Sequence, residues 1–235
     1  MKRILITGSS RGIGEAIARK AAKKGWQVIV HGRTDSDDLK KVHKAVKGEK
    51  VVFDLTDAAG IKKALKDVDA IDVLVNNAGV IITDRKWNGD EQVLRDCLDA
   101  NLIGTWRVTK ELAGKINKGG AIVNISSTYG TRHGAAAVLG YSMSKAGIDA
   151  MTIALAKELA PDIRVNGVAP SVVNTRMTEG AGPELIEYFR TQMLPDRLAE
   201  PEEIANAVLF AASDEASFMT GETIYVEGGY SIKGK

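Results

Sequence analysis

The chain has 235 residues, of which 44% are hydrophobic and 26% charged, and 24 of them are glycine. This composition is globular and excludes intrinsic disorder and collagen-like structure. Lys and Arg number 32 against 30 Asp and Glu, so the net charge of +2 gives no electrostatic reason to expect nucleic acid or a membrane as partner. The single cysteine, Cys97, excludes an internal disulfide, and no Cys/His cluster has metal-ligand spacing. We expect one soluble, cytoplasmic domain with neither metal nor membrane span.

Short β-rich runs alternate along the chain with longer runs of helical periodicity. Strands are expected at residues 3–7, 27–31, 51–53, 73–75, 121–125, 164–168 and 223–226. Helices are expected at residues 12–24, 37–47, 61–68, 91–116, 142–159, 183–193 and 202–212. Parallel neighbours need long crossover connections, so the alternation predicts an α/β fold with a doubly wound parallel sheet of about seven strands and helices on both faces. Such sheets bind ligands at the carboxyl ends of their strands.

A glycine-rich segment, Thr7-Gly8-Ser9-Ser10-Arg11-Gly12-Ile13-Gly14, connects the first expected strand to the first expected helix. Pyrophosphate must approach backbone N–H groups at a helix N-terminus, and Cβ atoms there would block it. Glycine triplets also occur in ordinary turns, but the strand before and the helix after favour a nucleotide site. The cofactor-binding residues predicted here are Gly8, Ser10, Arg11, Gly12, Ile13 and Gly14.

The end of the second expected strand should distinguish NAD from NADP. A carboxylate there would bind the ribose 2′-hydroxyl of NAD, but Val30-His31-Gly32-Arg33-Thr34 has none. Arg33 lies at this tip and Arg11 in the glycine loop, and two guanidiniums can hold a phosphate dianion. Either Arg could instead be a solvated loop residue, and the nearby Asp35 keeps NAD(H) as the alternative. We therefore expect NADP(H).

Tyr141 and Lys145 lie four residues apart, on one face of the expected helix 142–159 and its approach, and Ser127 follows the fifth expected strand. A carbonyl that accepts a hydride also needs a proton, and a free Tyr holds its proton with a pKa of about 10. A nearby ammonium would lower that pKa, and a Ser hydroxyl could position the carbonyl oxygen. On the alternative interpretation Tyr141 only packs at a helix start and Lys145 is solvated. We predict that Ser127, Tyr141 and Lys145 form a catalytic group.

The chain resembles the short-chain dehydrogenase/reductases along its whole length, and these motifs occur in the same order as in that family. The resemblance implies a single Rossmann-type catalytic domain over residues 1–235 and adds Asn101, in Asn101-Leu102-Ile103-Gly104, as the fourth catalytic residue, which supports Lys145. Tyr141 and Lys145 are also expected to contact the cofactor. The further cofactor contacts that it implies are Asp54, Leu55, Asn77, Ala78, Gly79, Pro170, Val173 and Thr175.

The C-terminal motifs, Arg197-Leu198-Ala199-Glu200-Pro201-Glu202-Glu203 and Glu227-Gly228-Gly229, are most similar to those of the 3-oxoacyl-(acyl-carrier-protein) reductases. The resemblance implies an NADPH-dependent homotetramer that reduces the ketone of a 3-oxoacyl thioester to a secondary alcohol, with Tyr141 as proton donor. Another small ketone, a sugar or a steroid-like alcohol is the alternative substrate. A module that senses NADP(H) without turnover is the alternative function, although a sensor would need none of the four catalytic residues.

Three departures limit the substrate assignment. Ser171 follows Pro170 where the family usually has Gly, and the interval from Ser127 to Tyr141 is one residue longer than usual. Residues 160–163 lack the basic residue with which similar reductases dock the acyl-carrier protein, and Lys115 and Lys118 are the only nearby substitutes. We expect a substrate lid near residues 171–195. Its apolar side chains could line an acyl pocket or could equally pack the lid onto the core.

Overall fold

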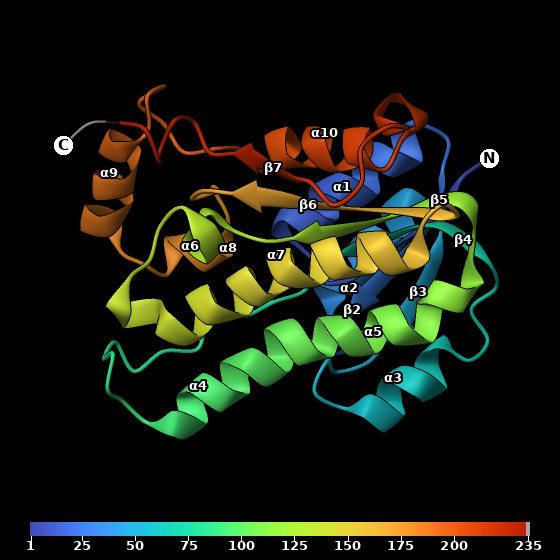
Figure 1. Ribbon diagram of the computed structural model, residues 1–235, viewed down its shortest axis with the longest axis horizontal. Coiled ribbons are helices and arrows are strands. Elements are labelled where there is room, and N and C mark those ends of the chain that lie inside the picture. Colours follow the sequence, from blue (N-terminus) through green and yellow to red (C-terminus); the bar gives the residue numbers. More distant parts are fainter. Residues whose placement is uncertain (234–235) are drawn as a thin grey trace.

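The protein is described by a computed structural model that covers residues 1–233. Seven strands form one parallel sheet with the order β3-β2-β1-β4-β5-β6-β7 (Figure 1). The order reverses between β1 and β4, which is where doubly wound sheets open a ligand crevice. The strands are β1 (Arg3–Ile6), β2 (Gln27–Gly32), β3 (Glu49–Val52), β4 (Ile71–Asn76), β5 (Ile116–Ile125), β6 (Ile163–Pro170) and β7 (Thr223–Val226). The expected single-domain, doubly wound sheet is confirmed.

Helices cover both faces of the sheet, as Figure 1 shows. Because side chains alternate along a strand, Ile4 and Ile6 pack in one hydrophobic cluster while Leu5 packs in the other. The first cluster joins the sheet to α1 (Gly12–Lys23), α2 (Asp37–Val46) and α10 (Pro201–Ala211). The second joins it to α3 (Ala58–Leu65), α5 (Gly104–Leu112) and α7 (Leu139–Leu159). The sheet is thus the middle layer of three.

The prediction of one helix over residues 91–116 is wrong at both its middle and its end. The structure has α4 (Glu91–Leu98), a π-helical turn at Asp99–Ile103, α5 and a 3₁₀ turn at Ala113–Lys115. β5 then starts at Ile116, which pairs with Ile71 across an irregularity in the register. Gly119 (φ 83°) and Gly120 lie inside this strand, and a Cβ on Gly120 would come within 2.6 Å of the Asp72 carbonyl oxygen. Gly120 therefore permits a close strand approach, and Gly119 supplies a left-handed conformation.

The carboxyl ends of the strands carry short helices that periodicity did not predict. These are α6 (Thr128–Thr131), a 3₁₀ turn at Ala136–Val138 and α8 (Arg176–Glu179). α9 (Pro183–Gln192) stands beyond the sheet at this end, together with α6 and α8 (Figure 1). α7 begins at Leu139, three residues earlier than expected, so Tyr141 lies inside its first turn. Among residues 1–233, no helix is both long and apolar enough to span a bilayer.

Candidate active site

The glycine loop after β1 has the tight geometry that its sequence predicts. Gly8 (φ 64°) and Gly12 (φ 57°) adopt left-handed conformations that favour glycine. A Cβ on Gly14 would lie 2.3 Å from the Gly8 carbonyl oxygen, so no larger residue fits there. Arg11 has extended backbone and immediately precedes α1, and Ser10, Arg11 and Ile13 remain at least partly accessible around the helix N-terminus. The loop therefore leaves backbone N–H groups open to an anion.

The turn after β4 supports the glycine loop from the neighbouring strand. The Thr7 hydroxyl accepts hydrogen bonds from the backbone N–H groups of Asn77 (2.9 Å) and Ala78 (3.0 Å). The Asn77 side chain donates in turn to the carbonyl oxygens of Thr7 (2.9 Å) and Gly8 (3.1 Å). A Cβ on Gly8 would lie 2.8 Å from the Ala78 Cα. The structure thus brings together two motifs that are about 70 residues apart in the chain.

His31, near the end of β2, supports the glycine loop from the other side. Its Nδ1 accepts the Gly8 N–H at 2.9 Å, and its Nε2 lies 3.0 Å from the Phe53 carbonyl oxygen. An N–H can only donate and a carbonyl can only accept, so the ring is neutral with its proton on Nε2. Burial lowers the pKa of His31 to about 4, although the Phe53 carbonyl and the Asp54 carboxylate act in the opposite direction. The sequence analysis assigned no role to His31. A histidine within an otherwise apolar strand was the available signal.

The two arginines expected to read a 2′-phosphate lie on loops that follow adjacent strands. Both side chains are exposed. Arg33 lies close enough to Asp54 to contribute to the lowered pKa of that carboxyl. Asp35, the residue on which the NAD alternative depended, forms an ion pair with Lys50 at 2.5 Å. This pairing lowers the pKa of Asp35, so its carboxylate already has a cationic partner.

Asp54 follows β3 and is held by the next turn. Its Oδ1 accepts both the backbone N–H (2.9 Å) and the hydroxyl (2.8 Å) of Thr56, the largest influence among those that lower its pKa. Both bonds go to Oδ1, so Oδ2 can accept from the amino group of an adenine. The neighbouring Leu55 is fixed through its carbonyl oxygen, which accepts from Arg107 at 3.2 Å.

Asn101 lies in the π-helical turn Asp99–Ile103. Such a turn contains one residue more than an α-helical turn, and this changes the direction of its side chains. The Asn101 side chain therefore reaches the loop after β4. The Asn101 amide pairs with the backbone of Val80, accepting at 2.8 Å and donating at 2.9 Å. A Cβ on Gly79 would lie 3.2 Å from Asn101 Oδ1 and 3.7 Å from Lys145 Nζ. Asn101, Gly79 and Lys145 therefore meet at one point.

Ser127, Tyr141 and Lys145 come together at the end of β5. The Ser127 Oγ accepts the Tyr129 N–H at 3.2 Å, which caps α6, and the Ser127 hydroxyl also interacts with the Tyr141 phenol. Lys145 Nζ donates to the Ile125 carbonyl oxygen at 2.7 Å and lies 5.6 Å from the centroid of the Tyr141 ring. All four predicted catalytic side chains thus lie around the carboxyl ends of β4 and β5.

The expectation that Lys145 lowers the pKa of Tyr141 is wrong for the protein in this state. Burial raises the pKa of Tyr141 to about 12, and it is the Ser127 hydroxyl that acts against this rise. Burial also lowers the pKa of Lys145 to about 8, while the Asp149 carboxylate acts in the opposite direction. Desolvation dominates because Lys145 is buried and Tyr141 is only partly exposed. At neutral pH the phenol therefore keeps its proton, as a proton donor must.

Ser144 is a second residue that the sequence analysis missed. Its Oγ accepts from the Asn101 amide at 3.1 Å and donates to the Tyr141 carbonyl oxygen at 2.7 Å. It is fully buried and joins the π-helical turn to the first turn of α7. Its position three residues after Tyr141, on the same helical face, was the signal that could have identified it.

The segment after β6, which contains Val173 and Thr175, approaches the glycine loop. A Cβ on Gly12 would lie 3.3 Å from the Thr175 Cγ2. Pro170 ends β6, and Val173 is buried and pairs with Ala199. In the expected lid, Met193 is buried, whereas four of the other apolar candidates are exposed. The exposed members are Met177, Leu185, Tyr188 and Leu194.

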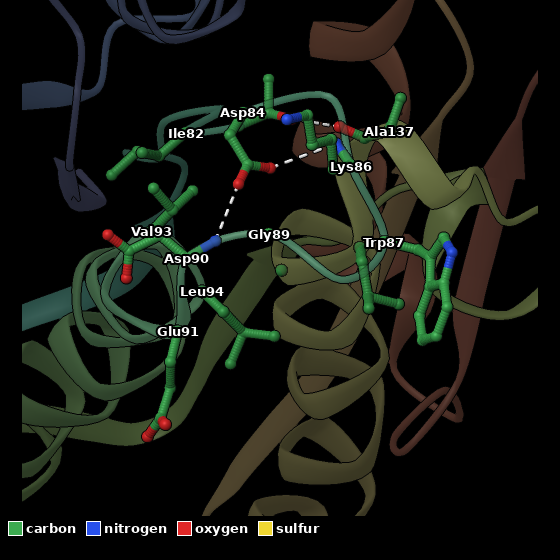
Figure 2. Close-up of a pocket in the computed structure, with 13 residues that line it drawn as sticks. Ile82, Asp84, Lys86, Trp87, Gly89, Asp90, Glu91, Val93, Leu94 and Ala137 are labelled. Atoms are coloured by element: carbon green, nitrogen blue, oxygen red, sulfur yellow. Dashed lines mark hydrogen bonds between the residues drawn. The ribbon is translucent and has the colours of Figure 1, made fainter.

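A pocket outside the predicted catalytic group lies between the loop after β4, α4 and the start of α7 (Figure 2). The Asp84 carboxylate organises this loop by accepting the backbone N–H groups of Lys86 (3.1 Å) and Asp90 (2.8 Å). The Thr83 hydroxyl ties it to the Ala137 carbonyl oxygen. The pocket holds about 60 Å³, room for only a few water molecules. It is therefore too small for a dinucleotide.

The residues at the carboxyl ends of β1, β2 and β3 fit an adenine dinucleotide. The glycine loop provides a cradle that Cβ atoms would fill, and it opens onto the N-terminus of a helix of 12 residues. Asp54 Oδ2 can accept a hydrogen bond at the adenosine end. No cluster of three His, Cys, Asp or Glu side chains suited to a metal ion exists among residues 1–233.

Comparisons with known proteins agree with this geometry. Residues 8–231 match the family model described as enoyl-(acyl carrier protein) reductase. The chain is 41% identical to the 3-oxoacyl-[acyl-carrier-protein] reductase of Aquifex aeolicus, over 96% of this chain and 95% of that protein. It is 35% identical to the reductase of the same name from Staphylococcus aureus, over 97% of each.

Solved structures show the same architecture. The ligand-free aldohexose dehydrogenase of Thermoplasma acidophilum has a TM-score of 0.90 and 30% identity, covering 99% of this chain and 95% of that one. The angucycline C-6 ketoreductase LanV, solved with bound NADP, has a TM-score of 0.92 and 28% identity, covering 98% and 96%. The chain belongs to the short-chain dehydrogenase/reductase family and is an NAD(P)-dependent oxidoreductase that acts on CH–OH and C=O groups.

Proposed function

We propose that the protein is an NADPH-dependent ketone reductase with Tyr141 as proton donor. The observation that carries this proposal is the arrangement of Ser127, Tyr141, Lys145 and Asn101 around the ends of β4 and β5, beside the glycine loop. A protein that only senses a nucleotide would need none of these four side chains at this point. Catalysis is therefore the better explanation of the site.

Each residue has a role that follows from its position. Bound NADPH would supply a hydride to the ketone carbon. The Ser127 hydroxyl positions the carbonyl oxygen, and the Tyr141 phenol, whose raised pKa keeps it protonated, donates the proton to that oxygen. The Lys145 ammonium lies beside the phenol, where it would hold the ribose of the cofactor. Asn101 fixes the loop that faces Lys145.

NADP(H) is the proposed cofactor, in preference to NAD(H). The supporting observation is the pair of exposed arginines, Arg11 and Arg33, on the loops after β1 and β2, while Asp35, on which the NAD(H) alternative depends, is paired with Lys50. The proposed contacts of the adenosine and pyrophosphate are the glycine loop, Asp54, Leu55 and Asn77–Gly79. Those of the nicotinamide half are Tyr141, Lys145, Pro170, Val173 and Thr175.

A 3-oxoacyl thioester is the proposed substrate, because two of the relatives compared carry this activity in their names. The exposed apolar side chains of the segment 171–195 support it as a lid over an acyl chain. Docking of an acyl-carrier protein has weaker support. Of the two substitute lysines, Lys115 donates to three backbone carbonyls near the end of α3 and Lys118 pairs with Asp162 at 3.2 Å.

The deciding experiment follows NADPH and NADH oxidation with purified protein and a panel of 3-oxoacyl thioesters, diketones and aldohexoses. The proposal expects the highest kcat/KM with NADPH and a 3-oxoacyl thioester. Preference for an aldohexose, the substrate class named for one structural relative, would establish the alternative. Absence of turnover with every substrate, in protein that binds NADPH, would contradict the reductase.

A homotetramer is the proposed assembly. Its support is apolar surface on the two long helices and the C-terminal region: α5 and the turn before it expose Ile103 and Trp106, and α7 exposes Met143 and Ile153. Phe210 on α10 and Phe218, which is fully exposed, are further apolar side chains at the surface. Large exposed apolar side chains grouped in this way are typical of subunit interfaces.

A further inference from the structure

His31, near the end of β2, joins the loops that follow β1 and β3 at the adenosine end of the crevice. Its Nδ1 accepts the Gly8 N–H after β1, and its Nε2 donates to the Phe53 carbonyl oxygen after β3. The His31 backbone exchanges hydrogen bonds with Ser9, accepting at 2.9 Å and donating to the Ser9 hydroxyl at 2.8 Å. The imidazole also stacks on the Phe53 ring with centroids 3.9 Å apart.

The residues that His31 holds are themselves proposed cofactor contacts or lie next to them in the chain. Gly8 is the first glycine of the loop and has a positive φ, Asp54 directly follows Phe53, and Arg33 is two residues beyond His31. With 2% of its surface exposed, His31 cannot itself contact a phosphate in solution. Its effect on a ligand therefore passes through the residues that it holds.

We propose that His31 is a positioning residue for the dinucleotide: its Nδ1 holds the Gly8 N–H and thereby fixes the loop that receives the pyrophosphate. The inference rests on the proposed NADP(H) site. The bond from Nε2 to Phe53 orients the ring so that Nδ1, and not an N–H, faces Gly8. Without an acceptor at this position the partly buried Gly8 N–H would lose its partner, and the loop would move to find another.

Substitution of His31 by Asn or by Gln tests the two hydrogen bonds of its ring separately. The Oδ1 of Asn can take the place of the His Nδ1, whereas the terminal amide nitrogen of Gln takes the place of Nε2. His31→Asn therefore keeps the acceptor for Gly8 and loses the reach to Phe53, and His31→Gln does the reverse. His43→Gln is the matched control, because the His43 Nε2 also lies 3.0 Å from a backbone carbonyl, that of Gly48, at the distant end of α2.

The experiment measures the Kd of NADPH by fluorescence titration and calorimetry in the absence of substrate, with thermal unfolding of every variant. We expect His31→Asn and His43→Gln to bind NADPH within about threefold of the unsubstituted protein and His31→Gln at least tenfold more weakly. Steady-state kinetics should show a raised KM for NADPH in His31→Gln, with kcat at saturating NADPH little changed. Equal Kd values for His31→Asn and His31→Gln would overturn the inference.

A measurement on the unsubstituted protein does not depend on the folding of a variant. NMR of ¹⁵N-labelled histidine should show His31 neutral and protonated on Nε2, with signals that shift as NADPH saturates the protein. A proton on Nδ1, or no shift at saturation, would also overturn the inference. If the unsubstituted protein binds neither NADPH nor NADH, the proposed function fails together with the inference. Normal binding with indistinguishable His31 variants removes the inference alone.

Discussion

The Nζ of Lys145 lies over the Tyr141 ring, 5.6 Å from its centroid. Both side chains project from the first two turns of α7, and Lys145 is anchored to the carbonyl of Ile125 at the end of β5. The ammonium is therefore fixed beside the phenol before any ligand arrives. Burial, and not the contact between the two groups, accounts for the protonated Tyr141 and for the lowered pKa of Lys145.

Replacement of Tyr141 by Phe should remove the proton donor and leave the fold intact. The phenol oxygen has its main interaction with Ser127, and the ring can remain in place. We expect kcat to fall at least a thousandfold while the Kd of NADPH and the melting temperature stay near those of the unsubstituted protein. Stopped-flow absorbance and calorimetry measure these quantities. A variant that retains a tenth of the activity would show that Tyr141 is not the donor.

The pH dependence of the reaction should follow Lys145. Its pKa of about 8 means that the amine is charged below pH 8 and loses its charge above it, whereas the pKa of Tyr141 lies near 12. We expect kcat/KM to fall about tenfold per pH unit above pH 8. The profile should be recorded from pH 6 to pH 10, with circular dichroism at each pH as a control for folding. A rate that stays constant to pH 9.5 would mean that the charge on Lys145 is not required.

Replacement of Arg33 by Ala should affect NADPH and not NADH. The loss of a charge-assisted hydrogen bond to a 2′-phosphate should raise the KM for NADPH by roughly 10- to 100-fold. Arg19→Ala is the control, because Arg19 pairs with Glu15 on the exposed face of α1. If Arg33→Ala weakens both cofactors equally, the guanidinium does not read the phosphate.

The stability of the protein should depend on His31 in mildly acidic solution. Burial lowers the pKa of His31 to about 4 in the folded protein, whereas an unperturbed histidine has a pKa of 6.5. Between these pH values the unfolded chain therefore binds a proton that the folded protein does not bind. The free energy of unfolding should therefore fall by up to about 3 kcal/mol as the pH falls from 6.5 to 4. Urea unfolding of the protein and of His31→Asn at several pH values isolates this contribution. The difference in the free energy of unfolding between the two proteins should change between pH 6.5 and pH 4, and parallel curves would contradict the assignment.

A charge on the exposed apolar face of α5 should disturb the proposed tetramer. Trp106 is about half exposed, so Trp106→Glu should fold normally as a monomer but oppose burial of this face in a subunit interface. Sedimentation equilibrium should show a smaller assembly than that of the unsubstituted protein. A control substitution at an exposed polar position of the charged helix α2, Lys44→Glu, should leave the assembly unchanged.

Local patterns were sufficient to predict the fold class. Seven apolar runs separated by amphipathic helices can only pair in parallel through crossovers, and each predicted strand has a counterpart in the sheet. Helix periodicity could not show the π-helical turn at Asp99–Ile103. Such a turn continues the helix and changes only the direction of the residues that follow. The start of β5 at Ile116 was also hidden, because its pairing partner, Ile71, is 45 residues away in the chain.

The candidate active site also has features that local sequence patterns predict and features that they do not. The chain by itself determined which residue types stand at strand ends: the glycine loop, Asn101, Ser127 and the Tyr141–Lys145 pair, because spacing along strands and helices is a local property. Only the tertiary structure decided their state of ionisation and their supports. Burial, which depends on every layer packed above a residue, raised the pKa of Tyr141 against the expected effect of Lys145, and it made His31 a neutral link between the loops after β1 and β3. Desolvation and long-range hydrogen bonds arise only when distant segments meet, so no local pattern of residues encodes them.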